Sequence, residues 1–384
     1  MMIAQPDTLT VAVGAALIAL TLLMPLCSPF FRRVKPDEEE AETGNDAQLP
    51  PLSVVMTIQD DAEAVEKNLP LFLEQDYPNE FRVIVVDESA NEYTRDILKQ
   101  LKARYAHLYT TFIPETSHYL SRRKLALTLG IKAAKTEWMV LTDIHCCPAN
   151  DQWLRSMAKE ADDQHDIVLG LTCYDEETPG YWRFDRLMTN CYQMRRALSG
   201  TAYRYDGRAL AFRHSKFMSN NGFLHNLMYL RGEYDFLVNE HAEAGRAAVS
   251  VQPATRLVQE RPSKKAWDYD HLYYLESRRH MSRGTGWRWI HFIDQTMLHL
   301  GYLLPVGVLL YAVLKGNELL GGIAVVGLIL TLVVRTILVL RAARNYGDKL
   351  FWMAVPLYEL RTVWQQLVFM LRYRTSDKYE FIRR

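Results

Sequence analysis

A candidate metal site follows the apolar run of residues 137–142. Asp143 ends that run, and His145 stands two residues later. A carboxylate and an imidazole at this spacing can both bind a divalent cation. Neutral imidazole suits Mn²⁺ and other transition metals better than Mg²⁺. We therefore predict that Asp143 and His145 hold a divalent cation, with Mn²⁺ favoured over Mg²⁺. A structural role for the histidine is the alternative.

Two further acidic sites follow apolar, β-branched runs earlier in the sequence. Asp60 comes just after residues 52–58, and Asp87 and Glu88 fall at the end of residues 82–89. In parallel sheets, ligands bind at the carboxyl ends of the strands. We therefore expect these acids to meet Asp143 at one ligand-binding edge. The alternative is that they are solvated strand ends, as in any α/β protein.

A basic cluster, Arg122-Arg123-Lys124, follows Ser121 at the predicted start of a helix. The helix dipole disfavours cations at this end and favours anions. Three cations here are therefore best explained by a bound anion such as a diphosphate. A surface cluster that faces acidic lipid is the alternative.

The segments that carry these residues alternate between strand and helix patterns. Apolar runs predict strands at residues 52–58, 82–89, 108–113 and 137–143. Amphipathic spacing predicts intervening helices at residues 62–75, 94–105 and 121–135. Continuously apolar strands between amphipathic helices are typical of a parallel sheet covered on both faces. The fold class is therefore predicted to be α/β.

Three long apolar segments predict a membrane protein. The first, at residues 9–31, is followed by Arg32, Arg33 and Lys35, and the positive-inside tendency then puts the next domain in the cytosol. The other two form a predicted hairpin. The expected order is an anchor at 9–31, an acidic linker at 36–50, a cytosolic domain at 51–290, a transmembrane hairpin at 295–340, and an interfacial helix with a basic tail at 341–384.

The overall charge of the chain is balanced. Lys and Arg number 45 in the 384 residues, and Asp and Glu also number 45. This balance gives no sign of a nucleic acid partner. The five cysteines show no CxxC pair, which argues against a zinc ribbon and favours a reducing compartment.

Three segments in order resemble the family-2 glycosyltransferases, which are inverting enzymes with the Rossmann-like GT-A nucleotide-sugar fold. These segments are PLSVVMTIQDDAE, FRVIVVDESANEYT and SRRKLALTLGIKAAKTEWMVLTDIH. The resemblance covers about residues 50–285 and extends to the membrane anchors. It implies that Asp60, Asp87 and Glu88 contact the nucleotide, and that Arg122 and Lys124 lie near its diphosphate. In the family a second Asp usually stands where this chain has His145, and another GT-A group uses Asp-x-His there.

Two later segments correspond to family motifs but diverge from them. YLRGEYDFLVNE resembles the motif that carries the catalytic base, which implies Glu233 as the base and Asp235 as the alternative. An acid pair favoured by a helix N-terminus is the non-catalytic interpretation. LESRRHMSRGTGWRW falls where many relatives have Gln-x-x-Arg-Trp, which implies a phosphate contact for Arg279. Trp287 and Trp289 in the same segment also suit a membrane interface.

Two functions follow as hypotheses. The first is a multi-pass enzyme of the bacterial cell membrane that uses a UDP-sugar and a lipid-linked or other membrane-proximal saccharide acceptor in cell-envelope polysaccharide biosynthesis. The second is a catalytically degenerate subunit that binds a nucleotide or a partner without transfer. The second rests on the accumulated departures from the family motifs, at Glu88, His145, Tyr234 and Glu276. Each of these replacements keeps a polar or ligating group, which favours the enzyme.

Overall fold

The computed structural model describes residues 7–35, 49–89, 91–113 and 121–381. The chain divides into two compact units. The helical unit comprises Met1–Arg33 and Thr285–Leu367, and the sheet unit comprises Val34–Gly284 and Val368–Arg384. The predicted acidic linker at 36–50 lies outside the described residues except for its last two.

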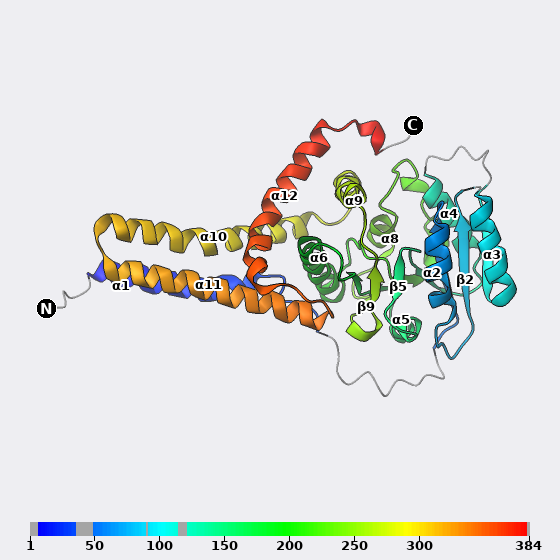
Figure 1. Cartoon of the computed structure of the whole chain (residues 1–384), viewed down its shortest axis with the longest axis horizontal. Helices are drawn as coiled ribbons and strands as arrows, with labels where there is room; N and C mark the ends of the chain where they lie inside the picture. The colour runs from blue at the N-terminus through cyan, green and yellow to red at the C-terminus, as the bar shows by residue number, and fades with distance from the viewer. Residues whose placement is uncertain (1–6, 36–48, 90, 114–120, 382–384) are drawn as a thin grey trace. The chain divides into compact units, whose positions relative to one another are not determined.

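The sheet unit contains a seven-stranded mixed sheet of the predicted α/β class (Figure 1). Its strand order is β3 (Leu108–Phe112), β2 (Phe81–Asp87), β1 (Leu52–Ile58), β4 (Trp138–Leu141), β8 (Leu210–Arg213), β6 (Ile167–Gly170) and β9 (Ala247–Ser250). The first four are mutually parallel, and β8 runs antiparallel to both of its neighbours. A smaller sheet has the order β5 (Cys146–Pro148), β10 (Leu257–Gln259) and β7 (Thr172–Tyr174).

Helices cover both faces of the parallel strands because the apolar residues of each strand point alternately to the two faces. One face packs against α2 (Ala62–Leu73) and α3 (Glu92–Arg104) in the main core. The other packs against α4 (Arg122–Ala133), where a Cβ on Gly130 would lie 2.7 Å from the Val55 side chain. The glycine thus lets α4 approach the sheet closely. All four predicted strands and three predicted helices of this half are confirmed.

The second half of the sheet unit holds elements that the sequence patterns did not predict. Its helices are α5 (Trp153–Lys159), α6 (Gly180–Ser199), α7 (His214–Ser219), α8 (Glu233–His241) and α9 (Lys264–Ser277). Helix α8 begins after Gly232, whose φ of 86° is a left-handed conformation that glycine adopts easily. The chain therefore turns sharply just before Glu233.

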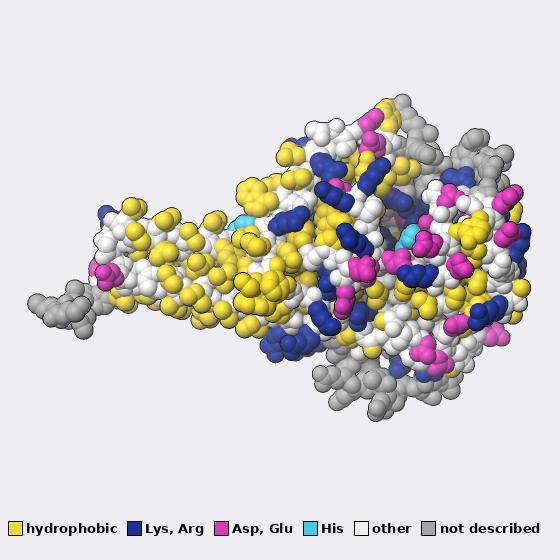
Figure 2. All heavy atoms as spheres, viewed as in Figure 1, with side chains coloured by type: hydrophobic (Ala, Val, Ile, Leu, Met, Phe, Trp, Pro, Cys, Tyr) yellow, Lys and Arg dark blue, Asp and Glu magenta, His cyan; other side chains and the backbone are white. Residues whose placement is uncertain are grey.

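The helical unit consists of long apolar helices. These are α1 (Thr8–Leu23), which continues as a 3₁₀ turn to Cys27, α10 (Thr285–Lys315), α11 (Glu318–Asn345) and the part of α12 (Val355–Thr375) up to Leu367. In the described part of the chain, Thr8–Cys27, α10 and α11 are long and apolar enough to cross a membrane. Hydrophobic side chains cover the visible face of these helices (Figure 2). The three predicted spans overlap these three helices.

One ion pair lies buried inside the helical unit. Arg335 of α11 donates from Nε and Nη2 to the two carboxylate oxygens of Glu359 in α12, each at 2.9 Å. Tyr302 of α10 donates a further hydrogen bond of 3.0 Å to Glu359. Charged groups in an apolar setting need such partners. The pair therefore joins the start of α12 to the hairpin.

Candidate active site

The carboxyl ends of β1, β2 and β4 bring the predicted acids to one edge of the sheet. Ile58 is paired with Asp87 in the β1–β2 register, and the Glu88 amide donates to the Ile58 carbonyl at 2.8 Å. The Thr142 amide donates to the Val55 carbonyl at 3.1 Å, which aligns the end of β4 with β1. The strand register alone thus places these acids side by side.

Asp87 and Glu88 are both buried at this edge. The Asp87 carboxylate accepts hydrogen bonds from the Ser89 amide at 2.8 Å and from the Ser89 hydroxyl at 2.9 Å. Burial raises the pKa of Asp87, and it raises the pKa of Glu88 as well. Arg122 donates to the Glu88 carbonyl oxygen at 2.5 Å, so this predicted residue does reach the edge. Two buried acids with raised pKa values are typical of a ligand-binding site.

Asp60 is exposed, and its φ of 53° is a left-handed conformation that aspartate tolerates. Its charge contributes to raising the pKa of Asp87, after the larger effect of burial. The two acids are therefore neighbours at the strand ends.

Arg123, the second residue of α4, joins two of the predicted site residues. Its Nη2 lies 2.6 Å from Asp143 Oδ2, and its Nε lies 2.5 Å from Glu233 Oε1. Burial alone would raise the pKa of each carboxyl. The Arg123 guanidinium instead holds both pKa values below their ordinary range. Arg123 is thus the central cation of the site. It is the one residue of the basic cluster 122–124 to which the sequence patterns assigned no individual role.

His145 is tied to the same edge by the turn after β4. Its backbone amide donates to Asp143 Oδ1 at 3.1 Å, and its Nε2 lies 3.5 Å from Asp61 Oδ2. The hydrogen bond to Asp61 raises the pKa of His145. The imidazole is about half exposed, so a ligand can reach it. The structure therefore places the two predicted metal ligands on one turn.

The donor atoms of this turn suit a divalent cation only in part. Carboxylate oxygens and an imidazole nitrogen are ligands that Mn²⁺ accepts. Among the described residues, however, no group of three or more His, Cys, Asp or Glu side chains is arranged to hold a metal ion. Asp143 Oδ2 is also engaged by Arg123. A cation here would need further ligands from a bound substrate or water.

The two candidate bases on α8 have different surroundings. Glu233 is 4% exposed, and its Oε2 has no hydrogen-bond partner among the described residues. Asp235 Oδ1 accepts from Arg204 Nε at 3.0 Å and from the Tyr205 amide at 3.1 Å. Burial raises the pKa of Asp235 to about 6. Residues two apart on a helix point in different directions. The structure thus joins only Glu233 to Asp143 through Arg123.

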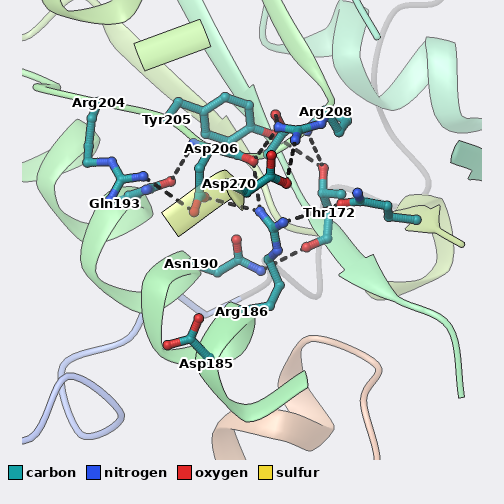
Figure 3. A network of polar contacts seen from close by, with 12 residues as sticks. Thr172, Asp185, Arg186, Asn190, Gln193, Arg204, Tyr205, Asp206, Arg208 and Asp270 are labelled. Carbon is teal, nitrogen blue, oxygen red and sulfur yellow. Dashed lines mark hydrogen bonds and ion pairs between the residues drawn. The ribbon is translucent and has the colours of Figure 1, made fainter. Parts of the chain in front are cut away.

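Two residues to which the sequence assigned no ligand contact complete the cluster. The buried Tyr234 hydroxyl has no hydrogen-bond partner in the described part of the chain. The Arg208 guanidinium lies 5.3 Å from the centre of the Tyr234 ring, and it also contributes to lowering the pKa of Asp143. Arg208 belongs to a buried Arg–Asp network (Figure 3). Its one sequence signal was the charged run YRYDGR at 203–208.

The network in Figure 3 fixes the segment around Asp206. Arg186 Nη1 lies 3.2 Å from Asp206 Oδ1, and Arg204 Nη2 lies 3.4 Å from Asp206 Oδ2. Arg208 Nη2 lies 3.7 Å from Asp270 on α9. These pairs hold Arg204 against Asp235 and Arg208 against Tyr234.

The structure does not bring Lys124 and Arg279 to the strand ends. Lys124 is fully buried, donates to the Asn226 carbonyl at 2.7 Å, and has a pKa lowered to about 8 by burial. Arg279 donates to the Tyr373 hydroxyl at 3.1 Å, and Tyr373 in turn donates to Glu276. Within the described residues, these contacts leave Lys124 beneath the site and Arg279 bound to the C-terminal part of the sheet unit. Their predicted diphosphate contacts stay predictions.

A separate open pocket of about 510 Å³ lies at the opposite end of α8 from Glu233. It is lined by polar side chains that include Asn220, His225, Asn239, Glu240 and Arg283. It does not contain the predicted site residues.

The mixed, mostly parallel sheet with helices on both faces is the fold of a GT-A domain. A solved structure supports the fold: the mannosyltransferase PcManGT from Pyrobaculum calidifontis, in complex with GDP-Man and Mn²⁺, superposes with a TM-score of 0.52 at 17% identity, covering 85% of this chain and 97% of that chain. Residues 53–220 match the family model for glycosyl transferase family 2. The matched residues include nearly all of the three segments on which the sequence resemblance rests, and the resemblance is confirmed. No curated protein sequence matches it.

Proposed function

We propose that the protein is an active, inverting hexosyltransferase that uses a UDP-sugar donor. The observation that carries the proposal is the Arg123 cluster: one guanidinium at the donor edge contacts both Asp143 and Glu233. A drifting, inactive site has no need to keep two buried acids around one partly buried cation, because burying charges costs free energy.

In the proposed reaction, Glu233 is the base. Its carboxylate takes the proton of an acceptor hydroxyl, whose oxygen forms a bond to the anomeric carbon. The bond from that carbon to the diphosphate breaks, and the nucleoside diphosphate leaves with the electron pair. Attack opposite the leaving group inverts the anomeric centre. Arg122 and Arg123 at the start of α4 would bind the diphosphate.

A divalent cation is proposed to act with the donor. Asp143 and His145 would hold it, and the substrate phosphates would supply further ligands, as is common for cations bound by few protein groups. The cation would offset the charge of the leaving diphosphate. Mn²⁺ is proposed over Mg²⁺ because of the imidazole, and Mn²⁺ is also the cation present in the similar mannosyltransferase structure.

The acceptor is proposed to be lipid-linked or presented at the membrane. Three helices have the length and composition of membrane spans. Basic residues after the first and third spans favour a multi-pass protein with a cytosolic sheet unit. A cell-envelope glycan is the proposed product. The exposed apolar side chains Leu357 and Trp364 favour an interfacial position for α12.

The alternative is a degenerate subunit that binds nucleotide without transfer. It draws support from Glu276 and Arg279, which stand at the divergent Gln-x-x-Arg-Trp position and are engaged with Tyr373. The two functions differ in whether sugar is transferred once nucleotide is bound.

Nucleotide release by the full chain in detergent separates the two. UDP-glucose, UDP-galactose, UDP-N-acetylglucosamine and GDP-mannose would each be supplied with Mn²⁺, Mg²⁺ or EDTA and a membrane lipid extract as acceptor. Metal-dependent release that stops in Glu233→Gln is expected. Nucleotide binding with no release from any donor would support the degenerate subunit instead.

A further inference from the structure

Arg123 has a position that links the two halves of the proposed site. It is a single guanidinium, and it divides its contacts between Asp143 at the end of β4 and Glu233 at the start of α8. Its side chain is 20% exposed, whereas those of Asp143 and Glu233 are 11% and 5% exposed. The cation is thus the most accessible member of the cluster.

The base is restrained in this arrangement. An arginine at 2.5 Å stabilises the charged form of Glu233 and so weakens it as a proton acceptor. The next cation, Arg231 Nη1, is 3.9 Å from the same oxygen, Oε1. Glu233 Oε2 faces no partner among the described side chains. One oxygen is therefore held by Arg123, and the other is left for a ligand.

A diphosphate at the start of α4 would compete for this guanidinium. Arginine binds phosphate through paired N–H donors. In Arg123, Nη2 donates to Asp143, and Nε lies in ion-pair contact with Glu233 without forming a hydrogen bond. Arg122 donates to the Glu88 carbonyl, and Lys124 is buried against Asn226. Of the three basic residues in this cluster, Arg123 is therefore the one whose donors face the acids of the site.

We propose that Arg123 holds Glu233 in an unreactive ion pair until the donor diphosphate binds, and that capture of the guanidinium by the diphosphate releases the base. This inference rests on the proposed function. It makes deprotonation of the acceptor depend on a bound donor. The diphosphate and Glu233 then compete for the Arg123 guanidinium, so the ion pair weakens binding of the diphosphate.

This competition for Arg123 can be measured from nucleotide affinities, without any catalytic turnover. The dissociation constants of UDP and GDP, each with Mn²⁺, would be determined by calorimetry for the full chain in detergent. If Arg123 must leave Glu233, Glu233→Gln should tighten nucleotide binding about five- to ten-fold. The gain should vanish when Arg123→Gln is also present. Arg123→Lys provides a second background that keeps the charge if Arg123→Gln binds too weakly to measure.

The double-mutant comparison distinguishes two causes of tighter binding: the release of Arg123 from Glu233, and the mere loss of a negative charge near the nucleotide. Glu240→Gln is the matched control, because it removes the same charge from the same helix and Glu240 contacts Asn226 instead of Arg123. Equal tightening by Glu233→Gln in every Arg123 background would mean only long-range repulsion and would overturn the inference. Unchanged or weaker binding in Glu233→Gln would overturn it too. If neither nucleotide binds the wild type or Glu233→Gln, the proposed function itself fails.

Discussion

Two buried clusters of arginine and carboxylate lie in the sheet unit, and they differ in how completely their polar atoms are paired. In the Arg204 cluster, Asp235 accepts from both the Arg204 side chain and the Tyr205 amide. Asp206 Oδ1 forms no hydrogen bond among the described residues, but it lies 3.2 Å from Arg186 Nη1 as part of an ion pair. In the Arg123 cluster, Glu233 Oε2 and the Tyr234 hydroxyl lack hydrogen-bond partners among the described residues.

We propose from this difference that the Arg204 cluster is structural and that the Arg123 cluster binds a ligand. Leaving a buried polar atom unpaired costs free energy, so such atoms call for an explanation. A bound ligand that forms hydrogen bonds with these atoms would be such an explanation. The clusters are otherwise alike in residue type and burial, so composition alone does not separate them. Substitutions in the Arg123 cluster should therefore mainly lower activity, and substitutions in the Arg204 cluster should mainly lower stability.

The largest expected effect is on catalysis, in Glu233→Gln. Loss of the base should lower kcat by about 10³-fold, within the range for general bases. Any fall in the apparent Tm should be small, because glutamine has the same size and Arg123 keeps its ion pair with Asp143. Nucleotide release and a thermal scan measure the two quantities. Glu240→Gln, which carries the same change on the same helix, should keep wild-type activity. A Glu233→Gln protein with normal activity would reject the assignment.

A large effect on stability is expected from Arg204→Met. The change leaves Asp235 buried without its cation and removes one of the two cations paired with Asp206, which should cost about 3 kcal/mol and lower the apparent Tm by roughly 6–12 °C. Adding Asp235→Asn should recover part of the loss, because it removes an uncompensated charge. If the single and double variants melt together, Arg204 is not the partner that stabilises Asp235.

The predictability of these two regions from sequence also differed. β1, β2 and β4 were recognisable because each is a short apolar run that ends in acids, and their shared edge follows from parallel pairing. Asp87, Glu88, Asp143 and His145 were predicted to lie at this edge in this way, and the structure places them there. The Arg204 cluster has no such pattern. Its pairs join α6, the loop before β8, α8 and α9, and pairing over such distances in the chain leaves no local period in the sequence.

The role of Arg123 also needed the structure. Three consecutive basic residues begin α4, and the sequence gives them equal weight. Helical geometry turns successive side chains by about 100°, so the three point to different surroundings. Lys124 points into the core, Arg122 reaches a backbone carbonyl, and Arg123 reaches the acids. For Arg279, the position in a motif implied a phosphate contact, but in the structure its side chain donates a hydrogen bond to Tyr373.

A moderate effect is expected at the metal turn. His145→Ala should raise the Mn²⁺ concentration needed for half-maximal activity about ten-fold, in line with the loss of one metal-site contact. The Mg²⁺ dependence should change less, because Mg²⁺ prefers oxygen ligands. Metal titrations of nucleotide release give both values. Equal shifts for the two metals would indicate that His145 acts by holding Asp61 and not as a ligand.

The smallest effect is expected from Tyr234→Phe. Because this change removes a single oxygen, it compares the two clusters most directly. If the hydroxyl is merely buried, its loss should leave activity unchanged, and stability should hold or rise slightly since no hydrogen bond is broken. If it awaits a ligand, kcat/KM should fall about three- to ten-fold, equivalent to one hydrogen bond, with an unchanged Tm. We expect the second result. Tyr205→Phe is the matched control: that hydroxyl donates to the Gly170 carbonyl at 2.5 Å, so its loss should lower Tm more than activity.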